Sequence, residues 1–133
     1  MPETGRVVFV VPEGHPPSGG DLYNRLLFAA LRDAGFVFET ATLRRLTPRS
    51  YPAGTEFWVD SLYIPELGER GPFRPDDRLF FIIHSLPSAD PGLAAARAER
   101  LRWDEDRLFA RAAGFLVTGA GMRGVLNGRG FGR

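Results

Sequence analysis

The chain has 133 residues, of which 44% are hydrophobic and 25% are charged, and its formal net charge is +1. These values are typical of one globular domain with a hydrophobic core; they exclude a disordered or collagen-like chain and give no electrostatic drive toward nucleic acid. Because the sequence has no cysteine and all 17 basic residues are arginine, it also excludes disulfides, cysteine-ligated metals, thiol catalysis and lysine-dependent chemistry.

Two further features bear on origin and location. The exclusive use of arginine indicates codon bias in a GC-rich, bacterial genome. Residues 1–5 lack the basic region of a signal peptide, and the apolar run at 7–11 is too short to form its core. No stretch approaches the ~20 apolar residues of a transmembrane helix. We therefore expect a cytoplasmic protein.

The first elements predicted along the chain are a strand, a loop and a helix. The run of valine and phenylalanine at residues 7–11 is typical of a strand covered on both faces, and Pro12 ends it. Residues 13–20, rich in Pro and Gly, predict a loop. Asp21 is a good N-cap for a helix that should extend to about residue 34.

This first helix is predicted to be amphipathic. Leucines and alanines at i, i+4 spacing form its predicted buried face: Leu22, Leu26, Leu27, Ala30, Leu31 and Ala34. Asn24 and Arg25 are expected to face mostly outward. Gly35 ends the helix, and residues 36–40 are predicted to form a second strand, which completes a βαβ unit.

Three more strands and two loops are predicted from the same kind of pattern. The apolar run at 79–83 is a second strongly buried strand, and shorter strands are predicted at 57–59 and 115–118. Residues 44–55 and 65–77 are rich in Pro, Gly and charge and predict loops.

Two helices accompany these strands. A long one is predicted at residues 93–113 and ends at Gly114, and another begins at 122–126 before Gly128 interrupts it. Strands that alternate with helices imply an open, mainly parallel sheet with helices on both faces. The sequence therefore predicts an α/β fold with a Rossmann-like sheet, as a single domain over residues 1–133.

Ligands of open α/β sheets bind beyond the carboxyl ends of the strands, and Gly19 and Gly20 are expected there. They precede a predicted helix, whose free N–H groups and dipole favour an anion, and without Cβ atoms they let a phosphate or sugar approach the backbone. We expect Asp21 to belong to the same cleft. The alternative is a flexible loop without a ligand. Because the dinucleotide fingerprint and the Walker pattern are absent, no cofactor is expected.

His84 ends the predicted strand at 79–83, and Ser85 follows it. A neutral imidazole at this edge can donate a hydrogen bond to a ligand or to a developing charge. The alternative is a histidine whose hydrogen bonds are all made to loop carbonyls. Thr118 ends the last predicted strand at the same edge. We expect His84 to be catalytic, with Ser85 and Thr118 lining the cleft.

Glu105 falls on the apolar face of the second predicted helix, four residues after Leu101 and four before Phe109. A buried carboxylate must be hydrogen-bonded or paired, so Glu105 either anchors a loop at the sheet edge or, if the helix register differs, lies at the surface. The neighbouring Asp104 and Asp106 are expected on a solvated, charged face.

Arg44, Arg45 and Arg49 form a basic cluster in a predicted loop. The cluster suits contact with an anionic acceptor or weak peripheral contact with a membrane surface, and the alternative is that it simply decorates the loop. With two histidines and no cysteine, the chain offers no metal-ligand spacing and no Ser-His-Asp arrangement, so no metal site is expected.

The order of these motifs resembles the opening of the retaining GT-B glycosyltransferases of family 4. The strand at 7–11, the loop that ends in Gly19-Gly20 and the amphipathic helix match that family, although Phe36 replaces its usual histidine. The resemblance continues in the strand that ends in His84. It extends to the helix with Glu105 and the strand after it.

The resemblance implies that the chain is the N-terminal, acceptor-side half of a GT-B enzyme. This enzyme would transfer a sugar from a nucleotide-sugar donor to a sugar, lipid or small-molecule acceptor. Gly19 and Gly20 would line the interdomain cleft near the donor diphosphate and the acceptor, and His84 would approach the donor sugar. The nucleotide-binding residues would belong to a C-terminal domain that residues 1–133 do not contain, so the isolated chain is expected to be inactive or nearly so.

Two other functions stay open at this point. One is a stand-alone flavodoxin-like domain that uses the same strand edges to bind a small ligand or a partner. The other is an NAD-linked or epimerase-type Rossmann enzyme, against which the missing dinucleotide fingerprint counts.

Overall fold

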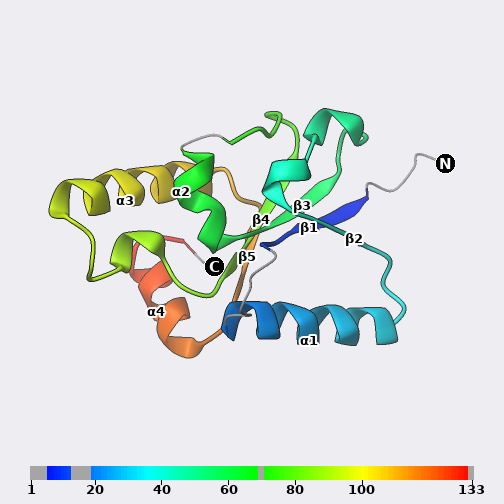
Figure 1. The fold of residues 1–133 in the computed structure, drawn as a ribbon, viewed down its shortest axis with the longest axis horizontal. Helices are drawn as coiled ribbons and strands as arrows, with labels where there is room; N and C mark the ends of the chain where they lie inside the picture. The colour runs from blue at the N-terminus through cyan, green and yellow to red at the C-terminus, as the bar shows by residue number, and fades with distance from the viewer. Residues whose placement is uncertain (1–5, 13–18, 69–70, 132–133) are drawn as a thin grey trace.

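The computed structural model describes residues 6–12, 19–68 and 71–131, and Figure 1 shows how they are arranged. Within these residues five strands form one sheet in the order β2-β1-β3-β4-β5, and every neighbouring pair is parallel. The strands are β1 (Val7–Val10), β2 (Glu39–Ala41), β3 (Glu56–Asp60), β4 (Arg78–Ile83) and β5 (Gly114–Val117). The predicted α/β fold with a Rossmann-like parallel sheet is confirmed.

Helices cover both faces of the sheet. The α-helices are α1 (Gly19–Asp33), α2 (Ile64–Leu67), α3 (Ala95–Ala110) and α4 (Ala120–Gly128). In Figure 1, α1 lies on one side of the sheet, and α2 and α3 lie on the other. Leu126 of α4 belongs to the same core cluster as Leu108 of α3. Among the described helices, none is long and apolar enough to cross a membrane.

Short 3-10 helices occupy parts of the chain that the sequence predicted as loops or left unassigned. They span Leu43–Arg45, Pro48–Ser50, Ser61–Tyr63 and Pro87–Ala89. The one at Ser61–Tyr63 leads directly into α2, which begins at Ile64. The structure therefore contains more helical turns than the hydrophobic pattern predicted, because turns of three or four residues are too short to show a periodicity.

The strands divide the core into two layers, because successive side chains of a strand point to opposite faces. On the side of α3, the core includes Val8 and Val10 of β1, Phe57 and Val59 of β3, and Leu79, Phe81 and Ile83 of β4. On the side of α1, it includes Phe9, Ile82 and Phe28, with Trp58 and Leu116 packed against them.

The predicted buried face of α1 is correct only for Leu27 and Leu31, which pack against the core beneath the helix. Leu22 and Leu26 are 57% and 64% exposed, whereas Asn24 is 3% exposed and Phe28 is 8% exposed. The helix carries two apolar stripes, and the one that faces the sheet contains Phe28 and Leu31 at i+4 and i+7 from Asn24. Periodicity alone favoured the stripe with more leucine. The structure instead turns Leu22 and Leu26 outward and buries Asn24 and Phe28 beside Leu31, and Asn24 finds a polar partner beneath it.

The second strand begins three residues later than predicted. Pairing with β1 starts at Glu39, which lies opposite Val8, while Phe36 and Val37 are 62% and 91% exposed. Gly35 ends α1 with a φ of +88°, a backbone conformation that a residue with a Cβ rarely adopts. The following residues carry the chain from the helix down to the sheet, so their apolar character does not reflect strand pairing.

Candidate functional site

Two polar side chains lie at the carboxyl ends of the neighbouring strands β3 and β4. Asp60 is the last residue of β3, and His84 directly follows β4. In the sheet, Asp60 is paired with Ile82, two residues before His84. The strand order changes direction between β1 and β3, and the carboxyl edge beside such a switch point is where ligands of open α/β sheets bind.

Asp60 is fully buried, and its carboxylate oxygens receive separate hydrogen bonds. The backbone N–H of Leu62 donates to Oδ1 at 2.9 Å, which also caps the short helix that follows β3. The side-chain Nδ2 of Asn24 on α1 donates to Oδ2 at 3.1 Å. A carboxylate removed from water is stable only with such partners, so Asp60 fixes the position of Asn24 and of the turn after β3.

His84 completes the arrangement. Its Nε2 lies 3.1 Å from Oδ1 of Asn24 and 3.4 Å from Oδ2 of Asp60, and its side chain is 11% exposed. The ring of Tyr23 meets the imidazole edge to face, with the ring centres 5.3 Å apart. Asn24, Asp60 and His84 therefore form one polar cluster between α1 and the sheet edge, which we call the Asn24–Asp60–His84 cluster.

A second hydrogen bond joins the two turns on which the cluster stands. The hydroxyl of Ser61, which is buried, donates to the backbone carbonyl of Ser85 at 2.8 Å. Ser85 thus contributes its carbonyl to the positioning of the turn after His84. Because the turns after β3 and β4 are tied together, the separation of Asp60 from His84 does not depend only on the contacts of those two side chains.

The predicted glycines start the helix that carries Asn24. Gly19 and Gly20 are the first residues of α1, and Asn24 lies one turn further on. Asp21 was predicted to cap this helix from outside, but α1 begins two residues earlier, so Asp21 lies within its first turn. The rest of the predicted loop, residues 13–18 with His15, lies outside the described residues.

Thr118 lies one strand further along the same edge. Its backbone N–H and its hydroxyl both lie 3.3 Å from the carbonyl oxygen of Ile83, the residue before His84. Thr118 is exposed, and within the part of the chain that the structure describes its hydroxyl bonds to the carbonyl of Ile83 and not to the cluster. It continues the pairing of β5 with β4, which accounts for its position without a ligand.

Glu105 lies in a different place and is fully buried. Its carboxylate accepts hydrogen bonds from the backbone N–H and the hydroxyl of Ser88, at 2.8 and 2.6 Å, in the short helix after β4. It also accepts one from Nη1 of Arg129 at 2.8 Å, while Nη2 of Arg129 lies 2.5 Å from Asp106. Glu105 therefore holds a loop and the end of α4 against α3.

The charges in this group also affect Arg129. Burial alone would lower the pKa of Arg129, but its hydrogen bonds to Asp106 and Glu105 and the charges of both carboxylates outweigh burial and raise it. Arg129 therefore stays positively charged. Asp104 was expected on a solvated face but is only 4% exposed, because α3 turns that side toward the rest of the fold.

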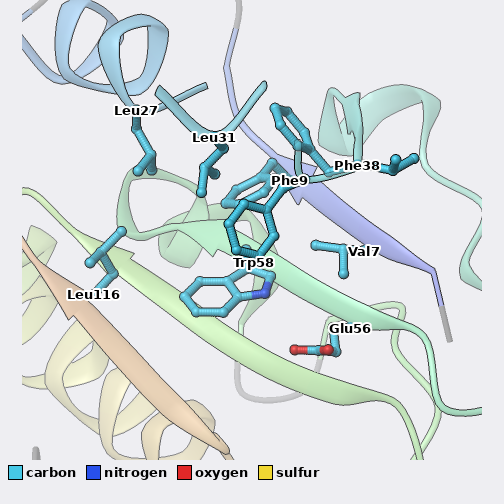
Figure 2. Close-up of a pocket in the computed structure, with 10 residues that line it drawn as sticks. Val7, Phe9, Leu27, Leu31, Phe38, Glu56, Trp58 and Leu116 are labelled. Atoms are coloured by element: carbon cyan, nitrogen blue, oxygen red, sulfur yellow. The ribbon is translucent and has the colours of Figure 1, made fainter. Parts of the chain in front are cut away.

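Two pockets lie outside the cluster. One, of about 360 Å³, is apolar and lies on the α1 side of the sheet; Figure 2 shows side chains that line it. Its lining includes Leu27 and Leu31 of α1, Trp58 and Glu56 of β3, and Leu116 of β5. Since Glu56 begins β3, this pocket lies toward the amino ends of the strands, away from the edge that carries His84.

The second pocket, of about 480 Å³, lies at the carboxyl edge. Pro12 and Thr42, which follow β1 and β2, line it together with Tyr63 and with Arg44 and Arg45 of the predicted basic cluster. Both arginines are exposed. This pocket, which we call the Arg44–Arg45 pocket, brings positive charge to the edge of the sheet that also carries the Asn24–Asp60–His84 cluster.

The sequence predicted His84 but not Asn24 or Asp60. Asp60 carried a usable signal, since it is a polar residue directly after an apolar run, as His84 is. The only signal for Asn24 was that the apolar residues Phe28 and Leu31 lie four and seven positions after it. The neighbouring leucines Leu22 and Leu26 obscured this spacing. Among the described residues, no group of three or more acidic or histidine side chains is arranged to hold a metal ion.

The fold and the cluster define an α/β domain of the Rossmann-like class with polar side chains at the carboxyl edge of its sheet. Comparison of the chain with protein-family models, with curated proteins and with solved structures finds no match.

Proposed function

We propose that this chain is the acceptor-side domain of a retaining glycosyltransferase that uses a nucleotide-sugar donor. The observation that carries the proposal is the hydrogen bond between His84, at the carboxyl end of β4, and Asn24, on the helix that begins at Gly19 and Gly20. It brings the histidine and the helix of the Gly-Gly motif to one edge of the sheet. Because this fold supports many functions, the proposal rests on the site and on the order of the sequence motifs.

The chemistry of the site suits polyhydroxylated ligands. Buried groups that accept and donate hydrogen bonds discriminate strongly for hydroxyl-bearing molecules, since an unmatched partner leaves a desolvated polar atom. In the proposal, His84 contacts a sugar hydroxyl, and the Arg44–Arg45 pocket holds an anionic part of the acceptor. The nucleotide of the donor is held by a second domain, as the resemblance implies.

A second candidate function is a stand-alone flavodoxin-like domain that binds a small ligand or a partner. The observation that favours it is the strand order β2-β1-β3-β4-β5, which is the flavodoxin-like order of doubly wound sheets. In that fold the ligand is held at the switch point between β1 and β3, so this candidate uses the same edge. In this candidate the edge holds another small ligand, such as a flavin, or a partner in place of a sugar.

The two candidates are separated by titrating residues 1–133 with myo-inositol, glucose, UDP-glucose and flavin mononucleotide while recording NMR spectra. We expect inositol or glucose to bind with a millimolar Kd, which corresponds to a binding free energy of about −4 kcal/mol. Binding should shift the NMR signals of the Asn24 side-chain amide and the His84 ring. UDP-glucose should bind weakly, and flavin should leave both signals unchanged. Micromolar flavin binding, or the absence of any sugar-dependent shift at the cluster, contradicts the proposal.

Turnover provides an independent check. Holding donor and acceptor together supplies roughly 7–11 kcal/mol of the barrier to transfer, and half of a cleft does not do this. Residues 1–133 should therefore release no measurable UDP from UDP-glucose. Micromolar affinity for a nucleotide sugar, measured by calorimetry, would place the donor site in this chain and overturn the division of roles.

A further inference from the structure

The hydrogen bonds of the Asn24–Asp60–His84 cluster have a direction that the carboxylate of Asp60 sets. The N–H of Leu62 can only donate, and it donates to Oδ1 of Asp60. The other carboxylate oxygen, Oδ2, lies 3.1 Å from the side-chain amide of Asn24. An ionised carboxylate only accepts hydrogen bonds, so the amide must present its NH₂ group to Asp60.

The orientation of Asn24 then decides the orientation of every group after it. The opposite amide orientation would place two acceptor oxygens against each other beside a carboxylate that is fully buried. With its Nδ2 directed at Asp60, Asn24 directs its Oδ1 at Nε2 of His84, at 3.1 Å. An amide oxygen only accepts, so Nε2 of His84 must carry a proton. Oδ2 of Asp60, 3.4 Å from Nε2, imposes the same requirement.

We propose that Asp60 and Asn24 are positioning residues that hold neutral His84 in the Nε2–H form, so that Nδ1 is its proton-accepting nitrogen. One consequence rests on the proposed function: the group that meets Nδ1 is a hydrogen-bond donor, such as a sugar hydroxyl. The arrangement itself does not depend on any ligand. It differs from a merely structural role because it specifies the location of a single proton.

The substitution Asp60→Asn tests the direction of the arrangement. The N–H of Leu62 still requires an acceptor, so the oxygen of the new amide should occupy the place of Oδ1. Its NH₂ group then faces Asn24, which must rotate by half a turn to offer its oxygen. The rotated Asn24 presents its NH₂ group to Nε2 of His84, and Nε2 must become an acceptor. The proton should therefore move from Nε2 to Nδ1.

The tautomer is measured by long-range ¹H–¹⁵N NMR on residues 1–133, at a pH high enough for the ring to be neutral. The sequence has two histidines, so a His15→Gln background leaves the signals of His84 alone. We expect the Nε2–H form in the wild-type cluster and the Nδ1–H form in Asp60→Asn. Nδ1–H in the wild-type chain, or an unchanged Nε2–H form in Asp60→Asn, overturns the inference.

Exchanging the two polar groups should restore the original state. In the double variant Asn24→Asp/Asp60→Asn, the NH₂ group of the new amide donates to the new carboxylate, and that carboxylate accepts from Nε2 of His84. We expect the Nε2–H form to return. If the double variant keeps the Nδ1–H form of Asp60→Asn, the orientation is not passed through position 24 and the inference fails.

A buried carboxylate elsewhere supplies the matched control. Glu105 is fully buried and hydrogen-bonded but belongs to a different group. Glu105→Gln should lower stability and leave the tautomer of His84 unchanged; a tautomer change in this variant would mean that the measurement reports general destabilisation and would overturn the assignment to Asp60.

The outcome also separates this inference from the proposed function. The tautomer measurements use no ligand. If the tautomer switches in Asp60→Asn while myo-inositol and glucose fail to shift the cluster, the arrangement stands and the sugar-binding function falls. If both sugars shift the cluster and the tautomer does not switch, the function stands and the positioning role of Asp60 falls.

Discussion

Oδ1 of Asn24 lies 3.1 Å from Nε2 of His84, although 60 positions separate the two residues in the chain. The contact joins α1 to the carboxyl end of β4, and Asp60 at the end of β3 accepts a hydrogen bond from the same asparagine. One amide therefore links a helix and two strands. Its replacement should affect both the stability of the fold and the state of the histidine.

Replacing Asn24 should cost more stability than replacing the leucine two positions further on. Asn24→Leu keeps the size of the side chain but removes the donor to buried Asp60, so we expect unfolding to become easier by about 1–3 kcal/mol. The control Leu26→Ala changes a side chain that is 64% exposed, and should alter stability by less than about 0.5 kcal/mol. Urea denaturation of both variants measures the difference. Equal effects, or a larger loss in Leu26→Ala, would contradict the placement of α1.

His84→Gln should separate the proposed binding role of His84 from its structural role. The glutamine amide can place an N–H near the position of Nε2 and preserve the contact with Asn24, so stability should change by less than about 1 kcal/mol. It has no group at the place of Nδ1. If His84 contacts the ligand, binding of myo-inositol and glucose should fall at least tenfold, which corresponds to about 1.4 kcal/mol. Unchanged sugar binding at full stability would show that His84 does not contact the ligand.

Glu105 is expected to contribute strongly to stability. Glu105→Ala removes the acceptor of Ser88 and leaves Arg129, whose side chain is 9% exposed, without one of its two carboxylates. Breaking such a buried pair costs about 3–5 kcal/mol. The side chain of Asp106, the other partner of Arg129, is 49% exposed. The control Asp106→Asn removes its charge and should cost less than about 1 kcal/mol. Thermal and urea denaturation compare the two; similar losses would mean that burial does not distinguish them.

The same group predicts how stability depends on pH. The pKa of Arg129 is raised in the folded protein, so its contribution is fully present below the ordinary pKa of arginine and is lost only as the pH rises through the still higher folded value. Arg129 should therefore add no pH dependence between pH 6 and 9. Urea midpoints of the wild type and Arg129→Gln should stay a constant distance apart over that range, and a gap that closes by pH 9 would contradict this.

Neighbouring residues before β2 should respond differently to substitution. Val37 is 91% exposed, so Val37→Asp should change the free energy of unfolding by less than about 0.5 kcal/mol. The ring of Phe38 packs against those of Phe9 and Phe28, with ring centres 5.1 and 5.4 Å apart. Phe38→Ala should therefore cost roughly 3 kcal/mol. Chemical denaturation measures both changes, and a large loss in Val37→Asp would restore Val37 to the strand that the sequence predicted.

Much of the fold follows from local features of the sequence. The apolar runs around Val8 and Phe81 predict buried strands, because they are short and rich in β-branched and aromatic residues and a strand covered on both faces has no polar side. Gly35 and Gly114 mark places where elements change. The alternation of strands and helices then predicts a parallel sheet. These features depend on backbone geometry and on neighbours a few residues away, so they can be recognised without knowing the fold.

The tertiary structure alone decided which polar groups meet. Asn24 and Arg25 both looked like outward-facing residues, yet Asn24 is buried, because β3 and β4 lie side by side beneath α1 and bring Asp60 and His84 to it. Glu105 similarly required the turn at Ser88 and the end of α4 before its burial had partners. The sequence determined the elements, since hydrophobic periodicity is local. The partners of buried polar atoms depend on strand order and helix rotation, which distant residues set together.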